Sequence, residues 1–159
     1  MKKYRQLILV VRETTSSFTT SCIIGDEHRV TLRAGLICLC LELCPTSGPC
    51  AVIRVDPAPG FSSLSNDEEL RGLSMSFEIG RVKNTNKNSV AEKCIAELGD
   101  ELLRICPEGD SVTPLTLAIV IANLNICIRD RGLSAREMWH QSDHFTNSQL
   151  PLSDLHLIK

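Results

Sequence analysis

Three acidic residues, Glu13, Asp56 and Glu92, stand where a metal site can be assembled from distant parts of the chain. Glu13 follows the apolar run at 7–11, and Asp56 closes the apolar run at 51–55. Glu92 belongs to a predicted helix and comes after Asp56 with 35 residues between them. Hard cations such as Mg²⁺ prefer oxygen ligands, usually carboxylates together with phosphate oxygens. The three side chains therefore suggest metal-dependent chemistry on phosphate groups.

The chemistry that fits this set is attack on a phosphodiester. Two metal ions about 3.5–4 Å apart can hold the attacking and leaving oxygens of an in-line displacement. Sites of open α/β sheets lie at the carboxyl ends of strands, so adjacent parallel strands would bring Glu13 and Asp56 together. The helix that carries Glu92 then has only to dock across that edge.

Each carboxylate also has a local structural interpretation, and the residues alone leave it open. Ser89–Glu92 has the pattern of a capping box, in which Glu92 would satisfy the first N–H groups of its helix. Asp56 precedes Pro57 and can serve as a turn aspartate. Glu13 can simply be a residue of the turn between two strands.

Composition limits the classes of function. The 159 residues suit one compact domain, and the 43% of apolar residues favour a folded chain. The net charge of −2 gives no overall attraction to nucleic acid, so such binding would need a local basic patch or metal ions. We see no leader peptide and no membrane span, and we expect an intracellular protein.

The eight cysteines are interpreted as reduced thiols, because no secretory signal is visible. Cys38, Cys40, Cys44 and Cys50 lack the paired spacing of structural zinc sites. His28, His140, His144 and His156 are scattered, so we expect no zinc in this domain.

The predicted elements alternate between strands and helices in the first half of the chain. Hydrophobic patterns predict strands at 7–11, 18–24, 51–55 and 74–79, and helices at 31–44 and 66–71. The segment 28–30 is either a short third strand or the start of the first helix. A polar loop from Gly80 then leads into the helix that carries Glu92, whose inward stripe is predicted as Ala91, Cys94, Ile95, Leu98, Leu102 and Ile105.

The second half of the chain is predicted to be helical. Thr113 and Pro114 form a helix start, and the helix runs to about Arg131 with apolar residues almost all round. A capping box at 134–137 opens another short helix, for which Trp139 is the expected buried anchor.

Most of the chain, about residues 7 to 155, resembles the catalytic core of LTR-retrotransposon and retroviral integrases, with the nearest likeness to animal Ty3/Gypsy-type elements. The resemblance is carried by Ile8–Phe18, Val55–Phe61, Lys83–Lys93 and Arg131–Met138. The 35-residue gap before Glu92 matches the family's D,D-35-E signature.

This resemblance implies an RNase H-like α/β fold with five mixed strands flanked by helices, forming a single core domain over residues 1–159. It implies 3′-end processing and strand transfer of DNA in the nucleus, with Glu13, Asp56 and Glu92 holding two Mg²⁺ or Mn²⁺ ions. It also implies a homodimer formed through the helices Thr31–Cys44 and Leu115–Arg131. The zinc-binding N-terminal domain and the basic C-terminal domain of the family have no counterpart here.

The polar loop before Glu92 and its flank are the expected DNA contacts: Arg81, Lys83, Asn84, Lys87, Asn88 and Lys93. Without the resemblance, the same residues describe an ordinary solvated loop. Thr15 and Phe61 match positions beside the first two family ligands and are expected as walls of the site.

One departure from the family matters, because its first metal ligand is Asp where this chain has Glu13. Glutamate is one methylene longer, and Mg²⁺ demands near-ideal octahedral geometry. Three outcomes stay open: an active enzyme, a weak enzyme that prefers Mn²⁺, or an inactive core kept as a DNA-binding or dimerisation module. Besides the transferase and the inactive module, an RNase H-like nuclease is a third and weaker functional hypothesis.

Overall fold

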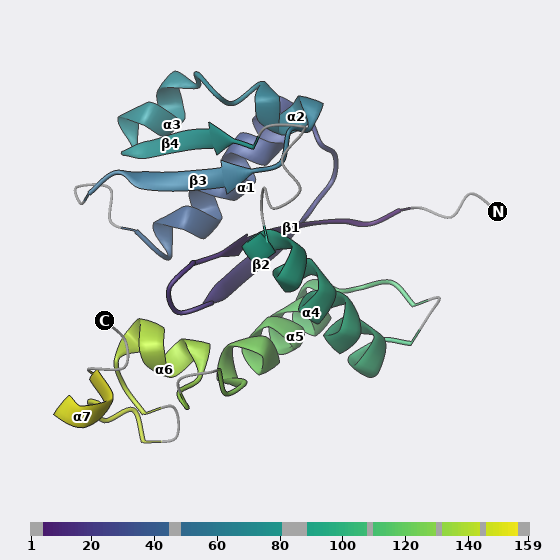
Figure 1. The fold of residues 1–159 in the computed structure, drawn as a ribbon. Coiled ribbons are helices and arrows are strands. Elements are labelled where there is room, and N and C mark those ends of the chain that lie inside the picture. The colour runs from purple at the N-terminus through teal and green to yellow at the C-terminus, as the bar shows by residue number, and fades with distance from the viewer. Residues whose placement is uncertain are drawn as a thin grey trace. The chain divides into compact units, whose positions relative to one another are not determined.

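The structure is a computed structural model that describes residues 5–44, 49–80, 89–107, 110–129, 132–143 and 146–155. The chain divides into two compact units, which are described separately: unit one holds residues 1–11 and 22–92, and unit two holds 12–21 and 93–159. The prediction of one integrase core-like domain stays a prediction. The elements in order are β1 Leu7–Arg12, β2 Thr19–Ile24, α1 Arg29–Leu41, β3 Ala51–Val55, α2 Pro59–Ser62, α3 Glu68–Gly72, β4 Met75–Ile79, α4 Ser89–Ile105, α5 Pro114–Ile126, α6 Ala135–His140 and α7 Leu152–Leu155 (Figure 1).

The strands form two small sheets, and this corrects the prediction of one five-stranded mixed sheet. Over the described residues, β1 pairs with β2, and β3 pairs with β4 in parallel from Ala51↔Met75 to Val55↔Ile79. The segment 28–30, predicted as either a short third strand or a helix start, contains the N-cap residue and the first two residues of α1. The backbone N–H of His28 donates to Asp26 Oδ1 over 2.9 Å, and the carbonyl of His28 accepts from Leu32. Of the two alternatives for 28–30, the start of the first helix is therefore confirmed.

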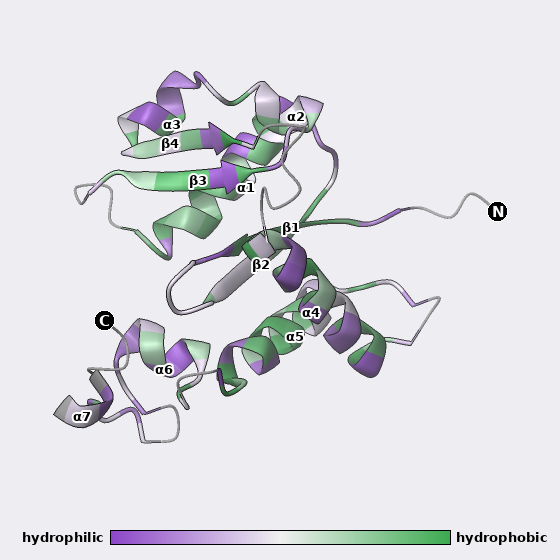
Figure 2. Cartoon of the chain, in the orientation of Figure 1, coloured by the Kyte–Doolittle hydropathy of each residue, from purple (hydrophilic) through white to green (hydrophobic). Residues whose placement is uncertain are grey.

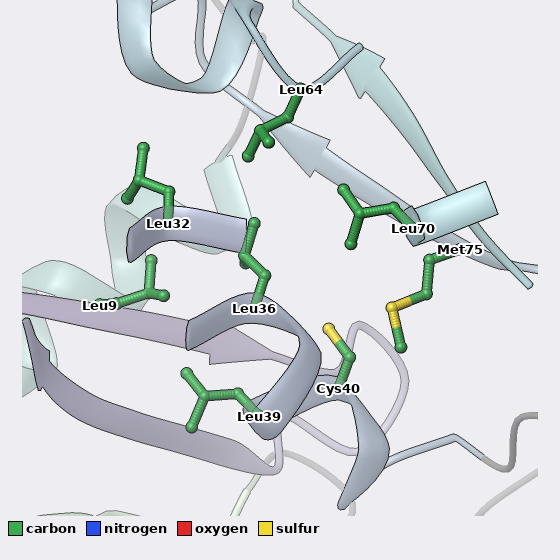
Figure 3. Close-up of a cluster of buried hydrophobic side chains, with 8 residues drawn as sticks. All are labelled: Leu9, Leu32, Leu36, Leu39, Cys40, Leu64, Leu70 and Met75. Atoms are coloured by element: carbon green, nitrogen blue, oxygen red, sulfur yellow. The ribbon is translucent and has the colours of Figure 1, made fainter. Parts of the chain in front are cut away.

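The core of unit one lies between α1 and the strands. Figure 3 shows Leu32, Leu36, Leu39 and Cys40 of α1 directed toward side chains from β1, β4 and the segment between β3 and β4. A helix that places apolar residues at spacings of three and four buries one face, and this is the face that meets the core. The residues it meets are Leu9, Leu64, Leu70 and Met75.

A close approach of α1 to β1 depends on Gly35. A Cβ atom added at this position would lie 2.7 Å from Cδ2 of Leu9, which is shorter than real Cβ contacts. Any larger residue would force Leu9 or the helix to shift. The close approach therefore explains why a glycine stands inside this helix despite its poor helix propensity.

Asp67 joins the start of α3 to α1 through a buried carboxylate. Oδ1 accepts from the backbone N–H groups of Glu69 and Leu70, which makes Asp67 the N-cap of α3. Oδ2 accepts from Arg29 over 2.8 Å and from Arg33 over 3.2 Å. The hydrogen bond from Arg29 leads the interactions that lower the pKa of Asp67 to about 2.

Replacing Asp67 with Asn should lower the free energy of unfolding by on the order of 1–2 kcal/mol at pH 7, because the cap weakens and the ion pairs are lost. Since the folded pKa lies below the unfolded one, the carboxylate stabilises the native state above about pH 4. That contribution disappears as the pH falls through the folded pKa of about 2. Urea unfolding at pH 7 and pH 3 should therefore show the difference between variant and parent shrinking at the lower pH.

The matched control is Glu68→Gln, because Glu68 is an exposed acidic residue in the first turn of the same helix. Its effect on unfolding should stay within a few tenths of a kcal/mol. An equal loss in both variants would assign the effect of Asp67 to general charge near the helix start.

Unit two is built from helices around α5. Leu117, Val120 and Leu124 of α5 are buried, and α5 also contacts α6. The apolar character of α5 runs along its whole length (Figure 2). The helix ends at Ile126, before the predicted Arg131, because Cys127 adopts an extended backbone with ψ of 134°.

One exposed side chain corrects the predicted inward stripe of α4, whereas the exposed apolar residues of α5 agree with a helix that is apolar almost all round. In α4, Cys94 and Leu98 are buried as predicted, but Ile95 is 63% exposed. In α5, Leu115 is 72% exposed, and Ile119 and Ile126 are each 45% exposed. The residue type alone does not tell whether an isoleucine lies on the buried or the exposed side of a helix. Only the packing of neighbouring elements decides which side is covered.

The helix starts of unit two follow their sequence signals. Thr113 caps α5 by accepting from the N–H of Thr116, and Ser134 and Glu137 form the predicted capping box of α6. Trp139 is half-buried and stacks on Phe18 with ring centroids 5.9 Å apart. All eight cysteines are free thiols. Among the described residues, no helix combines the length and apolarity that crossing a membrane requires.

Candidate active site

Glu13 lies directly after β1 and closes the turn that leads to β2. Its Oε1 accepts from the N–H of Thr15 over 2.9 Å, and its Oε2 accepts from the N–H of Ser16 over 2.6 Å and also from the Ser16 hydroxyl. The backbone N–H of Glu13 donates to the carbonyl of Phe18 over 2.9 Å. The loop Glu13–Phe18 is therefore organised around this one carboxylate.

The hydrogen bonds keep the carboxyl of Glu13 ionised. Partial burial opposes ionisation, but the side chain and backbone of Ser16 and the backbone of Thr15 outweigh it, so the pKa of Glu13 is lowered. A carboxylate has about four lone-pair positions. Three of these are used inside the loop, which leaves Oε1 as the oxygen with room for a further ligand.

Asp56 lies at the carboxyl end of β3 and is exposed. The edge is well defined, because the N–H of Gly80, just after β4, donates to the carbonyl of Val55 over 2.9 Å. The ends of β3 and β4 thus meet at one edge of the parallel pair, which is where sites of α/β sheets are found. The carbonyl of Asp56 accepts from the N–H of Ala58 over 2.8 Å, so its backbone does form the turn considered from the sequence. Its side chain faces solvent.

Glu92 is exposed in the first turn of α4, where a carboxylate is favoured by the positive end of the helix dipole. Ser89 is the first described residue of α4. The residues directly before Ser89 lie outside the described part of the chain, so the capping-box interpretation stays a prediction, and Glu92 itself is exposed.

The structure assigns Asp56 and Glu92 to unit one and Glu13 to unit two. Over the described residues, no group of three or more His, Cys, Asp and Glu side chains is placed to hold a metal ion. The chemistry of the donors nevertheless fits the ion that the sequence suggested. All three candidates offer carboxylate oxygens, two of them are exposed, and Glu13 keeps one oxygen with spare capacity.

Most of the expected DNA contacts, Arg81, Lys83, Asn84, Lys87 and Asn88, lie outside the described residues. Lys93 is exposed on α4. Of the two expected walls of the site, Thr15 is exposed in the loop of Glu13, and Phe61 is half-buried on α2 against the core of unit one.

Sequence reasoning missed an ionic cluster beside Glu13, formed by Arg12, Glu97 and Arg129. Arg12 donates to Glu97 Oε2 over 2.6 Å, and Arg129 donates to Glu97 Oε1 over 3.0 Å. The signal that could have revealed it is the position of Glu97 on the buried side of α4, between Cys94 and Leu98. A charged residue on an apolar stripe requires a partner.

The cluster also favours the ionised form of Glu97. Burial opposes the ionised form of Glu97, but the hydrogen bonds from Arg12 and Arg129 outweigh it, and the pKa of Glu97 is lowered. The neighbouring Cys94 is buried, and burial raises the pKa of its thiol. Cys94 thus serves as an apolar core residue and not as a nucleophile.

A second missed contact joins α5 to β2. The side chain of Asn125 accepts from the N–H of Thr19 over 2.8 Å and donates to the carbonyl of Thr19 over 2.9 Å. Both residues are buried. Asn125 therefore pairs with the backbone of β2 in the way that a neighbouring strand would.

No protein-family model matches the chain, and no curated protein matches its sequence. Solved structures do match its fold. The catalytic core domain of BIV integrase matches with a TM-score of 0.68 and 20% identity, over 86% of this chain and 86% of that chain.

The intasome of simian T-cell lymphotropic virus, solved in complex with a PP2A regulatory subunit, matches with a TM-score of 0.72 and 14% identity. This match covers 92% of the present chain and 52% of the other, so the chain spans about half of that protein. The chain therefore has the fold of a retroviral integrase catalytic core, an RNase H-like α/β fold.

Proposed function

We propose that this chain is a metal-dependent DNA polynucleotidyl transferase core, which processes and joins DNA 3′ ends in the manner of an integrase. The observation that carries the proposal is the combination of the integrase core fold with carboxylates after β1, after β3 and in the first turn of α4. Each of these positions is one where the fold can contribute a ligand. Action on element DNA in the nucleus is part of the same proposal.

In this proposal, Asp56 and Glu92 contribute exposed carboxylates and Glu13 contributes the free capacity of Oε1. When bound, two Mg²⁺ or Mn²⁺ ions would stabilise charge on the attacking and leaving oxygens of the phosphodiester. Lys93, together with Arg81, Lys83 and Lys87, supplies positive charge to the DNA backbone, and Asn84 and Asn88 supply hydrogen bonds. Thr15 and Phe61 form the walls of the site.

The test is a disintegration assay on branched DNA, run with Mn²⁺, with Mg²⁺ and with a chelator. We expect strand release with a divalent ion and none with the chelator. Absence of any metal-dependent release by the purified chain, in a preparation whose folding is verified by circular dichroism, would reject the transferase proposal.

A second candidate is an inactive core that is retained as a DNA-binding or dimerisation module, and the hydrogen bonding of Glu13 favours it. Three of the lone-pair positions of its carboxylate already serve the loop, so the residue has a structural role without any metal. This candidate predicts no Mn²⁺ binding by the native chain. It also predicts that the Glu13→Asp variant binds no Mn²⁺. The carboxylate would have to break its hydrogen bonds with Thr15 and Ser16 before it could bind a metal ion.

We also propose that the chain forms a homodimer through α1 and α5, the helices predicted from the sequence at 31–44 and 115–131. Exposed apolar residues on both helices support this: Val30 and Leu41 on α1, and Leu115, Ile119 and Ile126 on α5. Burial of such side chains between subunits contributes roughly 25 cal/mol per Å² of apolar surface. Sedimentation at high protein concentration should give a dimer, and a monomer at all concentrations would reject the proposed interface.

A further inference from the structure

We propose that Glu97 is a positioning residue, which acts through Arg12 and Arg129 to hold the loop of Glu13 in register with α4. The inference rests on the proposed function for its catalytic meaning, because Glu13 and Glu92 are the carboxylates whose placement it would govern. The observations that carry it come from unit two alone, in which Arg12, Glu97 and Arg129 form one hydrogen-bonded cluster.

The cluster is arranged around both oxygens of Glu97. The guanidinium of Arg12 approaches one oxygen, and that of Arg129 lies 3.0 Å from one oxygen and 3.1 Å from the other. The side chain of Arg12 is only 3% exposed and that of Arg129 is 15% exposed. Arg129 also donates to the carbonyl of Leu124 over 3.2 Å, near the end of α5. The carboxylate thus joins the end of β1, the middle of α4 and the segment after α5.

The loop Glu13–Phe18 is held at both of its ends. Arg12 precedes the loop and is bound to Glu97, while Thr19 follows it and is bound through its backbone to Asn125. A third contact closes the base of the loop, because Nε of Arg12 donates to Oγ1 of Thr19 over 2.9 Å. The conformation in which Glu13 accepts from Thr15 and Ser16 therefore depends on contacts with two helices.

The cluster of Arg12, Glu97 and Arg129 is connected to the proposed metal ligands through the continuous backbone. Arg12 and Glu13 are adjacent residues, and Glu92 and Glu97 belong to the same continuous helix. Five residues of helix correspond to a rise of about 7.5 Å. A tie at Glu97 therefore limits both the axial position and the rotation of α4 relative to the start of the loop. Small displacements at such a position are expensive for catalysis, since about 1 Å can cost on the order of 100-fold in rate.

The composition of the cluster favours a role in positioning the loop and α4 over a role in stabilising the fold. Two positive groups face one carboxylate, and the buried Nε of Arg129 has no hydrogen-bond partner among the described residues. Buried ion pairs are often no more stabilising than apolar residues of the same volume, because desolvation offsets the attraction. An apolar cluster would fill this space, but it would not fix the direction in which Arg12 and Glu97 meet.

The test compares two variants of the full chain with the parent. A triple variant, with Arg12, Glu97 and Arg129 each replaced by Met, removes the cluster without leaving an unpaired buried charge. Glu101→Gln is the matched control, because Glu101 lies on the same helix and pairs with Arg104 and Asn123 outside the cluster.

The first readout is hydrogen exchange at the amides of Thr15 and Ser16, which requires neither metal nor DNA. We expect exchange at least 10-fold faster in the triple variant than in the parent, with no change in Glu101→Gln and no matching acceleration in α5. Unchanged exchange of these two amides in a folded triple variant would overturn the inference, as would uniform acceleration throughout unit two.

The second readout is disintegration with Mg²⁺ and with Mn²⁺. We expect the triple variant to lose roughly 10- to 100-fold of activity, with the larger loss in Mg²⁺, because Mg²⁺ tolerates less distortion of its ligands. Equal losses with both ions, in proportion to the unfolded fraction, would overturn the positioning role. A parent protein inactive with both ions would instead reject the proposed function, and the exchange of Thr15 and Ser16 would then decide the inference by itself.

Discussion

Replacing Asp56 with Asn is expected to lower the rate of disintegration by at least about 100-fold, and the same is expected for Glu92→Gln. A factor of 100 corresponds to about 2.7 kcal/mol of transition-state stabilisation, which is within what a metal-holding carboxylate supplies. Both side chains are exposed, so neither change should disturb folding. The amide isosteres remove charge without changing shape, and the loss should therefore be confined to chemistry.

The assay needs a charge-matched control on the same surface. Asp100→Asn serves this purpose, because Asp100 is exposed on α4 two turns beyond Glu92. It should retain nearly full activity. The double variant with Asp56→Asn and Glu92→Gln should be scarcely worse than either single variant, because residues that act as one unit are not additive.

Activity that is independent of both Asp56 and Glu92 would remove the two carboxylates from the site. Loss of activity in Asp100→Asn to the same degree would indicate a general effect of charge on DNA binding. Thermal unfolding of each variant separates these cases from simple destabilisation.

Asn125→Leu is expected to lower the free energy of unfolding by about 2–4 kcal/mol. The substitution leaves the N–H and the carbonyl of Thr19 without their partner, and each unsatisfied buried group costs about 1–3 kcal/mol. Thr19 is fully buried, so water cannot replace the lost bonds. Urea unfolding monitored by Trp139 fluorescence is a suitable measurement, because Trp139 stacks on Phe18 at the end of the same loop.

The matched control is Asn123→Leu, on the same helix. Asn123 is half-buried and donates to Glu101 over 2.8 Å, a bond whose acceptor also pairs with Arg104. Its loss should cost less than about 1 kcal/mol. Similar losses at both positions would show that the pairing of Asn125 with the backbone of Thr19 contributes nothing beyond ordinary helix packing.

Local chemistry determined much of this fold from the sequence. The strands at 7–12, 19–24, 51–55 and 75–79 follow runs of β-branched and alternating apolar residues. Thr113 and the pair Ser134 and Glu137 mark the starts of α5 and α6, because their side chains bond to N–H groups only three residues away. Such signals lie within one turn of chain and need no tertiary context. The resemblance to integrase cores agrees with the fold of the solved structures.

Other features were decided only by tertiary contacts. The hydrophobic pattern at 28–30 fits either a short strand or a helix start, and in the structure α1 begins at Arg29, with its buried face packed on Leu9 and other core residues of unit one. The side of α4 that carries Ile95 stays exposed, although its residue type suits a core. Arg12 lies 85 residues from its partner Glu97, and Thr19 lies 106 residues from its partner Asn125. Pairings of that length depend on how helices are placed, and a single sequence read by local pattern carries no record of that placement.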